Sequence, residues 1–303
     1  MNHSRSLALA GLLVAILCWA GNSLVARAFA ADIPPLTLAF WRWVLAFLLL
    51  FPFVALPVWN NREHIKNAGW RLLVIAVLGI TGYNSFLYSA AHTTAAINIT
   101  LVNTCIPLMT FIAAGLLLKE WPARHAWLGM AVAVGGLLVL ISKGDPQMLL
   151  GLSFAPGDLI MLIAVADWAL YSVLLRRWST FFQPIPPLAL LGVSIGLGVV
   201  CLLPLYLYEY SQGARLTVTL PNLSAIAYTA VFASLVSYLA WNHGVKVLGA
   251  AAASMTSYLM PVFTAILGWV LLNEHLQSFH WIGGGLIFGG LLLATRKVVD
   301  SGR

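Results

Sequence analysis

The fold of this chain is decided by residues 107–136, PLMTFIAAGLLLKEWPARHAWLGMAVAVGG, because they recur 154 residues later as residues 261–290, PVFTAILGWVLLNEHLQSFHWIGGGLIFGG. Apolar segments match by chance in their leucines, so only rarer residues carry weight. Here several rare residues coincide at one offset without a gap: Pro107 with Pro261, Glu120 with Glu274, Trp127 with Trp281, and Gly129, Gly135 and Gly136 with Gly283, Gly289 and Gly290. This agreement indicates an internal duplication.

The repeat extends outward to nearly the whole chain. Residues 72–141 match residues 226–295 in the same register. Trp19 matches Trp168 at an offset of 149, and the segment 34–36 (PPL) matches 186–188 at an offset of 152. We therefore predict two domains, residues 1–146 and 147–303, and expect function to belong to the pair.

Composition predicts that the chain lies in a membrane. Of its 303 residues, 61% are hydrophobic and 8% are charged, whereas about a quarter are charged in an average soluble protein. A helix needs about 20 apolar residues to cross the hydrocarbon, and a membrane β-barrel would instead show short alternating strands. Long apolar runs without alternation predict an all-α integral membrane protein.

Ten apolar segments are long enough to be membrane-spanning helices. The first of them also imitates a cleavable signal peptide, but we expect it to be retained because Trp19 and Ser23 have partners in the second copy. The predicted spans are residues 7–30, 34–58, 70–92, 95–118, 124–141, 157–176, 185–209, 222–246, 249–272 and 278–295.

The basic residues predict the orientation of these spans. Alternate loops lie on opposite sides, and 12 of the 16 Lys and Arg residues fall on the side of the termini, three on the other side, and Arg42 within the second span. The positive-inside rule then places both termini in the cytoplasm, as expected for a bacterial inner membrane. Because the charges form no dense patch or tail, we expect no nucleic-acid partner.

The number of spans in each copy has a geometric consequence. Five is odd, so the second copy must enter the membrane from the opposite side to the first. The sequence therefore predicts ten transmembrane helices as two inverted five-helix repeats. Inverted repeats of this kind are typical of alternating-access transporters, whose substrate site lies near the membrane midplane between the halves.

Several motifs resemble the EamA family of the drug/metabolite transporter superfamily. They are Tyr88 with the following SAAHTTAA, Pro107, Lys119-Glu120, Gly129 and Gly135-Gly136, with their second copies, and Trp19, Asn22 and Arg42 in the first two spans. The resemblance implies a ten-helix transporter, commonly an exporter of amino acids or other small metabolites, with a central cavity and no cofactor. The aromatic-rich interior is similar to that of the family's exporters of aromatic and neutral amino acids.

The two copies also differ where the cavity is expected. Ser237 and Tyr238 stand where the first copy has Tyr83 and Asn84, and Asn273 replaces Lys119. The resemblance therefore implies a substrate class and leaves the substrate open.

Polar residues in two spans fall on one helical face in each copy. Such groups are costly in hydrocarbon and normally face the bundle interior, and a proline kinks its helix and frees carbonyls. We predict helix kinks at Pro107 and Pro261 and cavity positions for Asn103 and Tyr258. Thr100 and Ser254 either line the cavity or hold helices together. The two faces comprise Thr100, Asn103, Thr104 and Pro107, and Ser254, Ser257, Tyr258 and Pro261.

Aromatic residues deep within the spans provide the second signal for a site. Most Trp and Tyr residues of membrane proteins lie at the interfaces, but Trp19, Trp168 and Tyr83 are about ten residues from a span end. Aromatic rings stack on apolar groups and attract ammonium groups. The predicted substrate-binding residues are Trp19, Asn22, Tyr83, Asn84, Tyr88, Asn103, Trp168, Tyr171, Tyr238, Trp241 and Tyr258.

Two ionisable residues lie inside predicted spans. Asp167 is beside Trp168, where it binds a substrate ammonium, carries a coupling proton or pairs with a neighbouring polar group. Arg42 is about eight residues into its span, where it snorkels outward, holds the helices in place or attracts a carboxylate, and a structural role is favoured. The glycines of the fifth and tenth spans favour close helix packing, through Gly285 and Gly289 and through Gly129 with Ala133.

The leading hypothesis is a carrier that exports neutral or aromatic amino acids, or related small metabolites, by alternating access. The alternative is a broad drug/metabolite carrier of the same fold. An intramembrane enzyme is the rival from another class, but the spans contain no convergent catalytic groups and no metal-ligand spacing. A channel would need a ring of like polar residues. We expect a small-molecule substrate and a lipid bilayer as partners, and leave the oligomeric state open.

Overall fold

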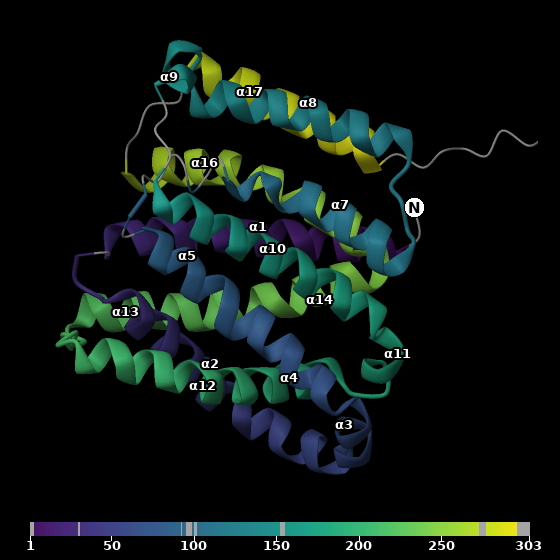
Figure 1. The fold of residues 1–303 in the computed structure, drawn as a ribbon, viewed down its shortest axis with the longest axis vertical. Coiled ribbons are helices and arrows are strands. Elements are labelled where there is room, and N and C mark those ends of the chain that lie inside the picture. The colour runs from purple at the N-terminus through teal and green to yellow at the C-terminus, as the bar shows by residue number, and fades with distance from the viewer. Residues whose placement is uncertain are drawn as a thin grey trace, which may run out of the picture.

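The computed structural model describes residues 3–29, 31–91, 93–94, 99, 102–151, 155–272 and 277–295. These residues form helices and turns and no strand (Figure 1). Eight of the helices in these ranges are long and apolar enough to cross a membrane, and two shorter apolar helices cover 105–118 and 278–294. The predicted all-α fold is confirmed for the described residues, whereas ten membrane spans in an inverted repeat stay a prediction.

Most helices begin and end close to the predicted spans. The span predicted over residues 95–118 differs, because α7 begins at Cys105 and residues 95–98 and 100–101 lie outside the described ranges. Three spans are interrupted by short π- or 3₁₀-helical segments, labelled η, and short helices lie in the connections. The bounds are α1 His3–Ala28, α2 Pro35–Asn60, α3 Arg62–Ala68, α4 Trp70–Ala76, η1 Val77–Gly82, α5 Tyr83–Ala91, α7 Cys105–Leu118, α8 Arg124–Ile141, α9 Gln147–Leu150, α10 Pro156–Arg177, α11 Ser179–Phe182, α12 Pro187–Ser211, α13 Leu220–Tyr228, η2 Thr229–Val236, α14 Ser237–Leu248, α15 Ala250–Met255, η3 Thr256–Leu259, α16 Met260–Leu272 and α17 Ser278–Thr295.

Local sequence explains where several helices begin and end. Pro35, Pro156 and Pro187 occupy the first turns of α2, α10 and α12, where the missing N–H has no intrahelical partner to lose. Gly249, with φ of +90°, separates α14 from α15. An L-residue with a side chain is strained at that φ, so glycine allows the chain to turn back into the bundle.

The first turn of α2 is capped by a side chain from α12. The Glu209 carboxylate accepts hydrogen bonds from the backbone N–H of Leu36 at 2.9 Å and from the N–H and hydroxyl of Thr37 at 2.6 and 2.7 Å. The positive end of the α2 dipole and the free N–H groups favour a carboxylate there. This contact joins the two halves, because the residues involved are more than 170 positions apart in sequence.

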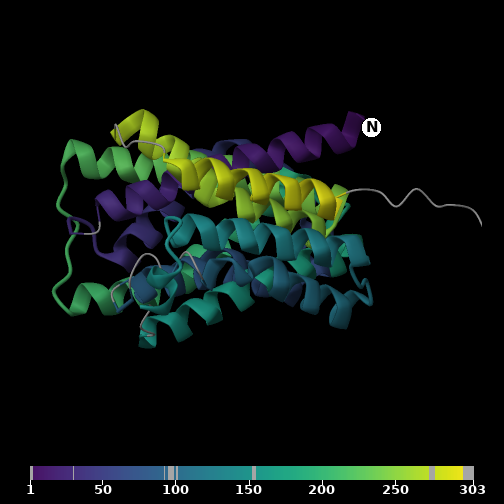
Figure 2. The ribbon, with the colours of Figure 1, turned by 90° about the horizontal axis from the view of Figure 1, so that it is seen from above.

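The helices run nearly parallel to one another in a bundle (Figures 1 and 2). We call the end at which α1 begins the terminus end and the opposite end the distal end. α17 also ends at the terminus end. α8 and α17 lie side by side along one edge of the bundle, and α2 and α12 lie together near the opposite edge (Figure 1).

The π-helical segments occupy equivalent places in the two copies. η1 ends at Gly82 and η2 ends at Val236, which match at the 154-residue offset. A π-helical segment changes the register of backbone hydrogen bonding, and a carbonyl in a membrane helix needs a donor from within the protein. The equivalent carbonyls of Gly79 and Ala233 receive side-chain donors: the Tyr238 hydroxyl donates to Gly79, and the Trp19 indole donates to Ala233 at 2.9 Å.

Glycines bring the backbones of α8 and α17 together. A Cβ at Gly136 would lie 2.6 Å from the Gly283 carbonyl oxygen, and a Cβ at Gly129 would lie 2.4 Å from that of Gly290. Ala133 also belongs to this contact, since its backbone faces Gly290. The predicted close packing is therefore present. It is not made by Gly285 and Gly289, the other predicted pair, where an added Cβ meets nothing within 4 Å.

This contact predicts different outcomes for two neighbouring glycines. Gly136→Ala should destabilise the protein by about 1–3 kcal/mol, because the methyl group forces the backbones of α8 and α17 apart. Gly135→Ala is the matched control, since its Cβ would meet nothing within 4 Å, and alanine stabilises a helix by up to about 1 kcal/mol relative to glycine. Thermal unfolding of both variants in detergent measures the difference, and equal stability would contradict this packing.

Candidate functional site

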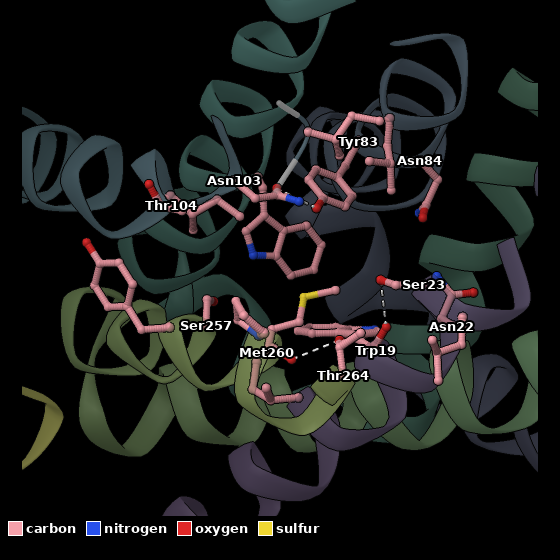
Figure 3. Close-up of a pocket in the computed structure, with 18 of the residues that line it drawn as sticks. Trp19, Asn22, Ser23, Tyr83, Asn84, Asn103, Thr104, Ser257, Met260 and Thr264 are labelled. Carbon is pink, nitrogen blue, oxygen red and sulfur yellow. Dashed lines mark hydrogen bonds between the residues drawn. The ribbon is translucent and has the colours of Figure 1, made fainter. Parts of the chain in front are cut away.

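The bundle contains a cavity of about 620 Å³ that both halves line. Figure 3 shows side chains of α1, among them Trp19 and Asn22, and of the η3–α16 region facing Tyr83 and Asn103 from the other side. The cavity extends to the distal end, because residues at the helix ends there also line it. These residues are Ile33, Pro35, Thr94, Ile141 and His280.

A cluster of aromatic rings forms the floor of the cavity. The rings of Trp19 and Trp168 meet edge to face, with centroids 5.2 Å apart and planes at 87°. Trp168 also contacts Tyr83 at 5.2 Å and Tyr238 at 5.6 Å. These are the separations at which aromatic pairs attract. We call Trp19, Tyr83, Trp168, Tyr171, Tyr238 and Trp241 the aromatic cluster.

The lower part of the aromatic cluster closes the bundle toward the terminus end. Tyr171 and Trp241 are buried and do not line the cavity. The Tyr171 hydroxyl donates to the Asn242 side-chain oxygen at 2.7 Å, and the Trp241 indole N–H donates to the Ser172 hydroxyl at 3.2 Å. Each bond connects α10 with α14, so these four residues close the bundle between the cavity and the terminus end.

The cavity wall carries polar atoms with unused hydrogen-bonding capacity. The Tyr83 hydroxyl donates to the Asn103 side-chain oxygen at 3.1 Å. The side-chain oxygen of Asn22 and the hydroxyl of Tyr258 are buried without a hydrogen-bond partner, although both residues line the cavity. Buried polar atoms are normally paired, so these positions are suited to a polar ligand or to water.

Part of the predicted polar faces lies at the cavity, and the predicted helix kinks stay a prediction. Pro107 and Pro261 both line the cavity. Each proline lies in the first turn of a regular helix. Pro107 follows the start of α7 at Cys105, and Pro261 follows the start of α16 at Met260, directly after η3. Ser254 is fully buried and donates to the Ala251 carbonyl, so it holds the backbone rather than lining the cavity. Thr100 and Glu274 lie outside the described residues.

Asp167 lies behind the cavity wall. One carboxylate oxygen packs against Gly82, where a Cβ would come within 2.4 Å of it. The carboxylate accepts a hydrogen bond from the backbone of Tyr83, while Oδ2 has no partner. Asp167 is not among the residues that line the cavity, so a substrate in the cavity does not touch it in this conformation.

Most predicted site residues lie around one cavity. The structure brings together Trp19, Asn22, Tyr83, Asn84, Tyr88, Asn103, Trp168, Tyr238 and Tyr258 as lining residues, and it places Tyr171, Trp241 and Asp167 behind them. Sequence reasoning did not select Ser23, Met260 and Thr264, which also line the cavity (Figure 3). Thr264 could have been found, because it stands three residues after Pro261 and matches Thr110 in the first copy.

The described residues include no group of three or more His, Cys, Asp or Glu side chains that could hold a metal ion. The cavity is instead aromatic with amide and hydroxyl groups, a lining typical of small-molecule binding sites.

The family profile of the EamA-like transporters matches residues 6–142 and residues 155–296. The chain belongs to this family. It is an integral membrane protein and a transporter, with a small molecule as its substrate and a lipid bilayer as its surroundings.

Relatives and a solved structure agree with this assignment. The chain is 29% identical to the uncharacterized transporter YyaM of Bacillus subtilis, over 86% of this chain and 84% of YyaM. It is 28% identical to the uncharacterized inner membrane transporter YedA of Escherichia coli, over 97% of this chain and 93% of YedA. A solved crystal structure with 21% sequence identity superposes with a TM-score of 0.75 over 96% of both chains, which supports the fold alone.

The cavity geometry predicts which positions water-soluble reagents reach. In a background with Cys18, Cys105 and Cys201 replaced by serine, Ser257→Cys should react with a membrane-impermeant thiol reagent, because Ser257 lines the cavity. Ser172→Cys, the same chemical change below the floor at a fully buried position, should not react. Labelling in membrane fragments that the reagent reaches from both sides, followed by mass spectrometry, measures both, and equal reactivity would contradict a closed floor.

Proposed function

We propose that the protein consists of two inverted five-helix halves that transport a small molecule by alternating access. Three observations support this: the sequence repeat, the equivalent π-helical segments, and a family profile that matches two separate ranges of the chain. In such carriers the halves rock against each other about a central site. The present conformation, with a cavity reaching the distal end, represents one of the two access states.

The distribution of charge supports an orientation for these states. If both termini are cytoplasmic, as the positive-inside rule predicts, the distal end faces the outside and the structure is open outward. The opposite state then requires the contacts at the terminus end to break, including those of Tyr171 with Asn242 and Trp241 with Ser172. A reporter domain fused after Arg303 tests the orientation, because it should be active only in the cytoplasm.

The proposed substrates are neutral or aromatic amino acids, or related amphipathic metabolites, and the proposed direction is export. The observation that carries this choice is the aromatic floor of the cavity beside amide and hydroxyl groups, which together suit an apolar body with a polar head. Export rests on the family resemblance. A broad drug/metabolite carrier would share the fold and the cavity, and only substrate range separates the two.

Flux measurements in proteoliposomes test the function. Trp168→Ala should lower the kcat/KM for labelled tryptophan or phenylalanine at least about tenfold, because it removes the ring against which the apolar body of the substrate would be buried, a contact of roughly 1.5–3 kcal/mol. Trp70→Ala, at an exposed position near the terminus end, is the control and should transport like wild type. Absence of saturable flux for every amino acid would overturn the substrate assignment, and equal flux of unrelated amphipathic compounds would favour the broad carrier.

We further propose that Asp167 carries the coupling proton. A carboxylate inside a membrane helix is a functional position by default, and here Oδ2 is unpartnered behind the cavity. Asp167→Asn keeps the shape and removes the titratable group, so flux should become insensitive to an imposed pH gradient. Asp32→Asn, an exposed carboxylate at the distal end, is the control. Undiminished acceleration by the gradient in Asp167→Asn would refute this role.

A further inference from the structure

Arg42 is buried at the cavity wall among hydrogen-bond acceptors from both halves. It is 1% exposed and lines the cavity. Its Nε donates to Ser234 at 3.0 Å, Nη1 donates to Asn84 at 3.2 Å and to Tyr88 at 3.1 Å, and Nη2 donates to the Ala233 carbonyl at 3.4 Å. A guanidinium has five N–H groups, so one Nη2 N–H is left over by these four bonds.

Among the residues that the structure describes, no carboxylate pairs with the positive charge of Arg42. The ion pairs found among the described residues are those of Glu63 with Arg62 and Lys66, and the acceptors around Arg42 are neutral. Removing an unpaired charge from water costs several kcal/mol, and neutral hydrogen bonds replace only part of its hydration. A buried cation that borders a cavity, with no counter-ion, therefore attracts an anion into that cavity.

Neighbouring groups add further donors on the same wall. The Asn84 amide nitrogen is buried beside the Tyr238 hydroxyl and has no hydrogen-bond partner of good geometry. Its oxygen already accepts from Arg42, which turns the nitrogen away from the guanidinium. Tyr88 also lines the cavity, and its hydroxyl accepts from Arg42, which leaves its own O–H free to donate. Arg42 and Tyr88 thus each keep one donor at the cavity, whereas the Asn84 nitrogen is buried and the Asn84 oxygen holds the guanidinium in place.

We propose that Arg42, which Asn84 holds in position, and Tyr88 form a subsite for the carboxylate of the substrate, whose apolar body lies against the rings of Trp19 and Trp168. This subsite deepens the proposed function and rests on it, because it names the charged group that a substrate must carry. The two oxygens of a carboxylate can accept from the remaining Nη2 N–H of Arg42 and from the Tyr88 hydroxyl together, which a single-atom anion does less well.

The subsite belongs to one half alone. At the 152-residue offset Arg42 is matched by Ser194, and at the 154-residue offset Asn84 is matched by Tyr238. The second half therefore lacks both the cation and the amide. The substrate is oriented by the first half in every access state, with its carboxylate held against α2 and α5, although the two halves share the aromatic floor.

The test uses three probes that share an indole ring and differ in charge: indole-3-propionate, tryptamine and tryptophan. Binding to the purified full-length protein is measured by calorimetry. Wild type should bind indole-3-propionate and tryptophan, and tryptamine at least about tenfold more weakly, since a charge-assisted bidentate contact contributes roughly one to two factors of ten. Arg42→Gln should lose the preference for the acids, and Arg42→Lys should keep part of it. Arg62→Gln, which removes an exposed cation, should bind like wild type.

Asn84→Asp keeps the test decisive if Arg42→Gln does not fold. The aspartate has the shape of asparagine and supplies a carboxylate at the position now 3.2 Å from Nη1, so the protein should be at least as thermostable as wild type and should no longer bind indole-3-propionate. Gln212→Glu adds the same charge at an exposed turn and should change neither property.

Each outcome decides between the subsite and its alternatives. Equal binding of acid and amine by wild type, retention of the acid preference in Arg42→Gln or Asn84→Asp, or no binding of either acid by wild type would overturn the subsite. Acid-selective binding lost in these variants would establish it. If that binding is present but proteoliposomes transport no amino acid, the subsite stands and the proposed substrates are wrong.

Discussion

The structure depends on one constraint, that backbone carbonyls freed inside a membrane helix must find donors within the protein. The carbonyls of Gly79 and Ala233 occupy equivalent positions in η1 and η2, and each is met by a side chain from a segment of the other half: Tyr238 for Gly79, and Trp19 for Ala233. Each half therefore supplies a hydrogen-bond donor for a free backbone carbonyl of the other half. Because the donors are aromatic, the same side chains that satisfy the carbonyls also form the floor of the cavity.

This double use explains why the site has few charged groups. The aromatic cluster provides packing, hydrogen-bond donors and a surface for an apolar ligand, so the interior needs few charged side chains. Arg42 is the exception, and it also donates to the Ala233 carbonyl. The buried guanidinium of Arg42 is thus tied to the same π-helical segment as Trp19, and a ligand held by Arg42 would act directly on the contact between the halves.

The all-α fold and most of the cavity could be predicted because the duplication compares the chain with itself. Trp19 and Trp168 stand out as rare residues that match, and Asn103 and Tyr258 follow from helical spacing around a proline. Arg42 was expected to be structural, because its role depends on the absence of a counter-ion, and a sequence does not show which carboxylates approach it. Likewise, the choice among glycines in α8 and α17 depends on rotation about the helix axis, which spacing alone does not fix.

The central claim is that the bonds to Gly79 and Ala233 hold the two halves together, and pulsed electron–electron double resonance tests it most directly. Spin labels at Asn67 and Lys246, exposed positions near the terminus end in different halves, report the separation there. Losing two hydrogen bonds costs about 1–3 kcal/mol. The double variant Trp19→Phe/Tyr238→Phe should therefore add a longer distance population that wild type lacks. An unchanged distance distribution in a folded double variant would contradict the claim.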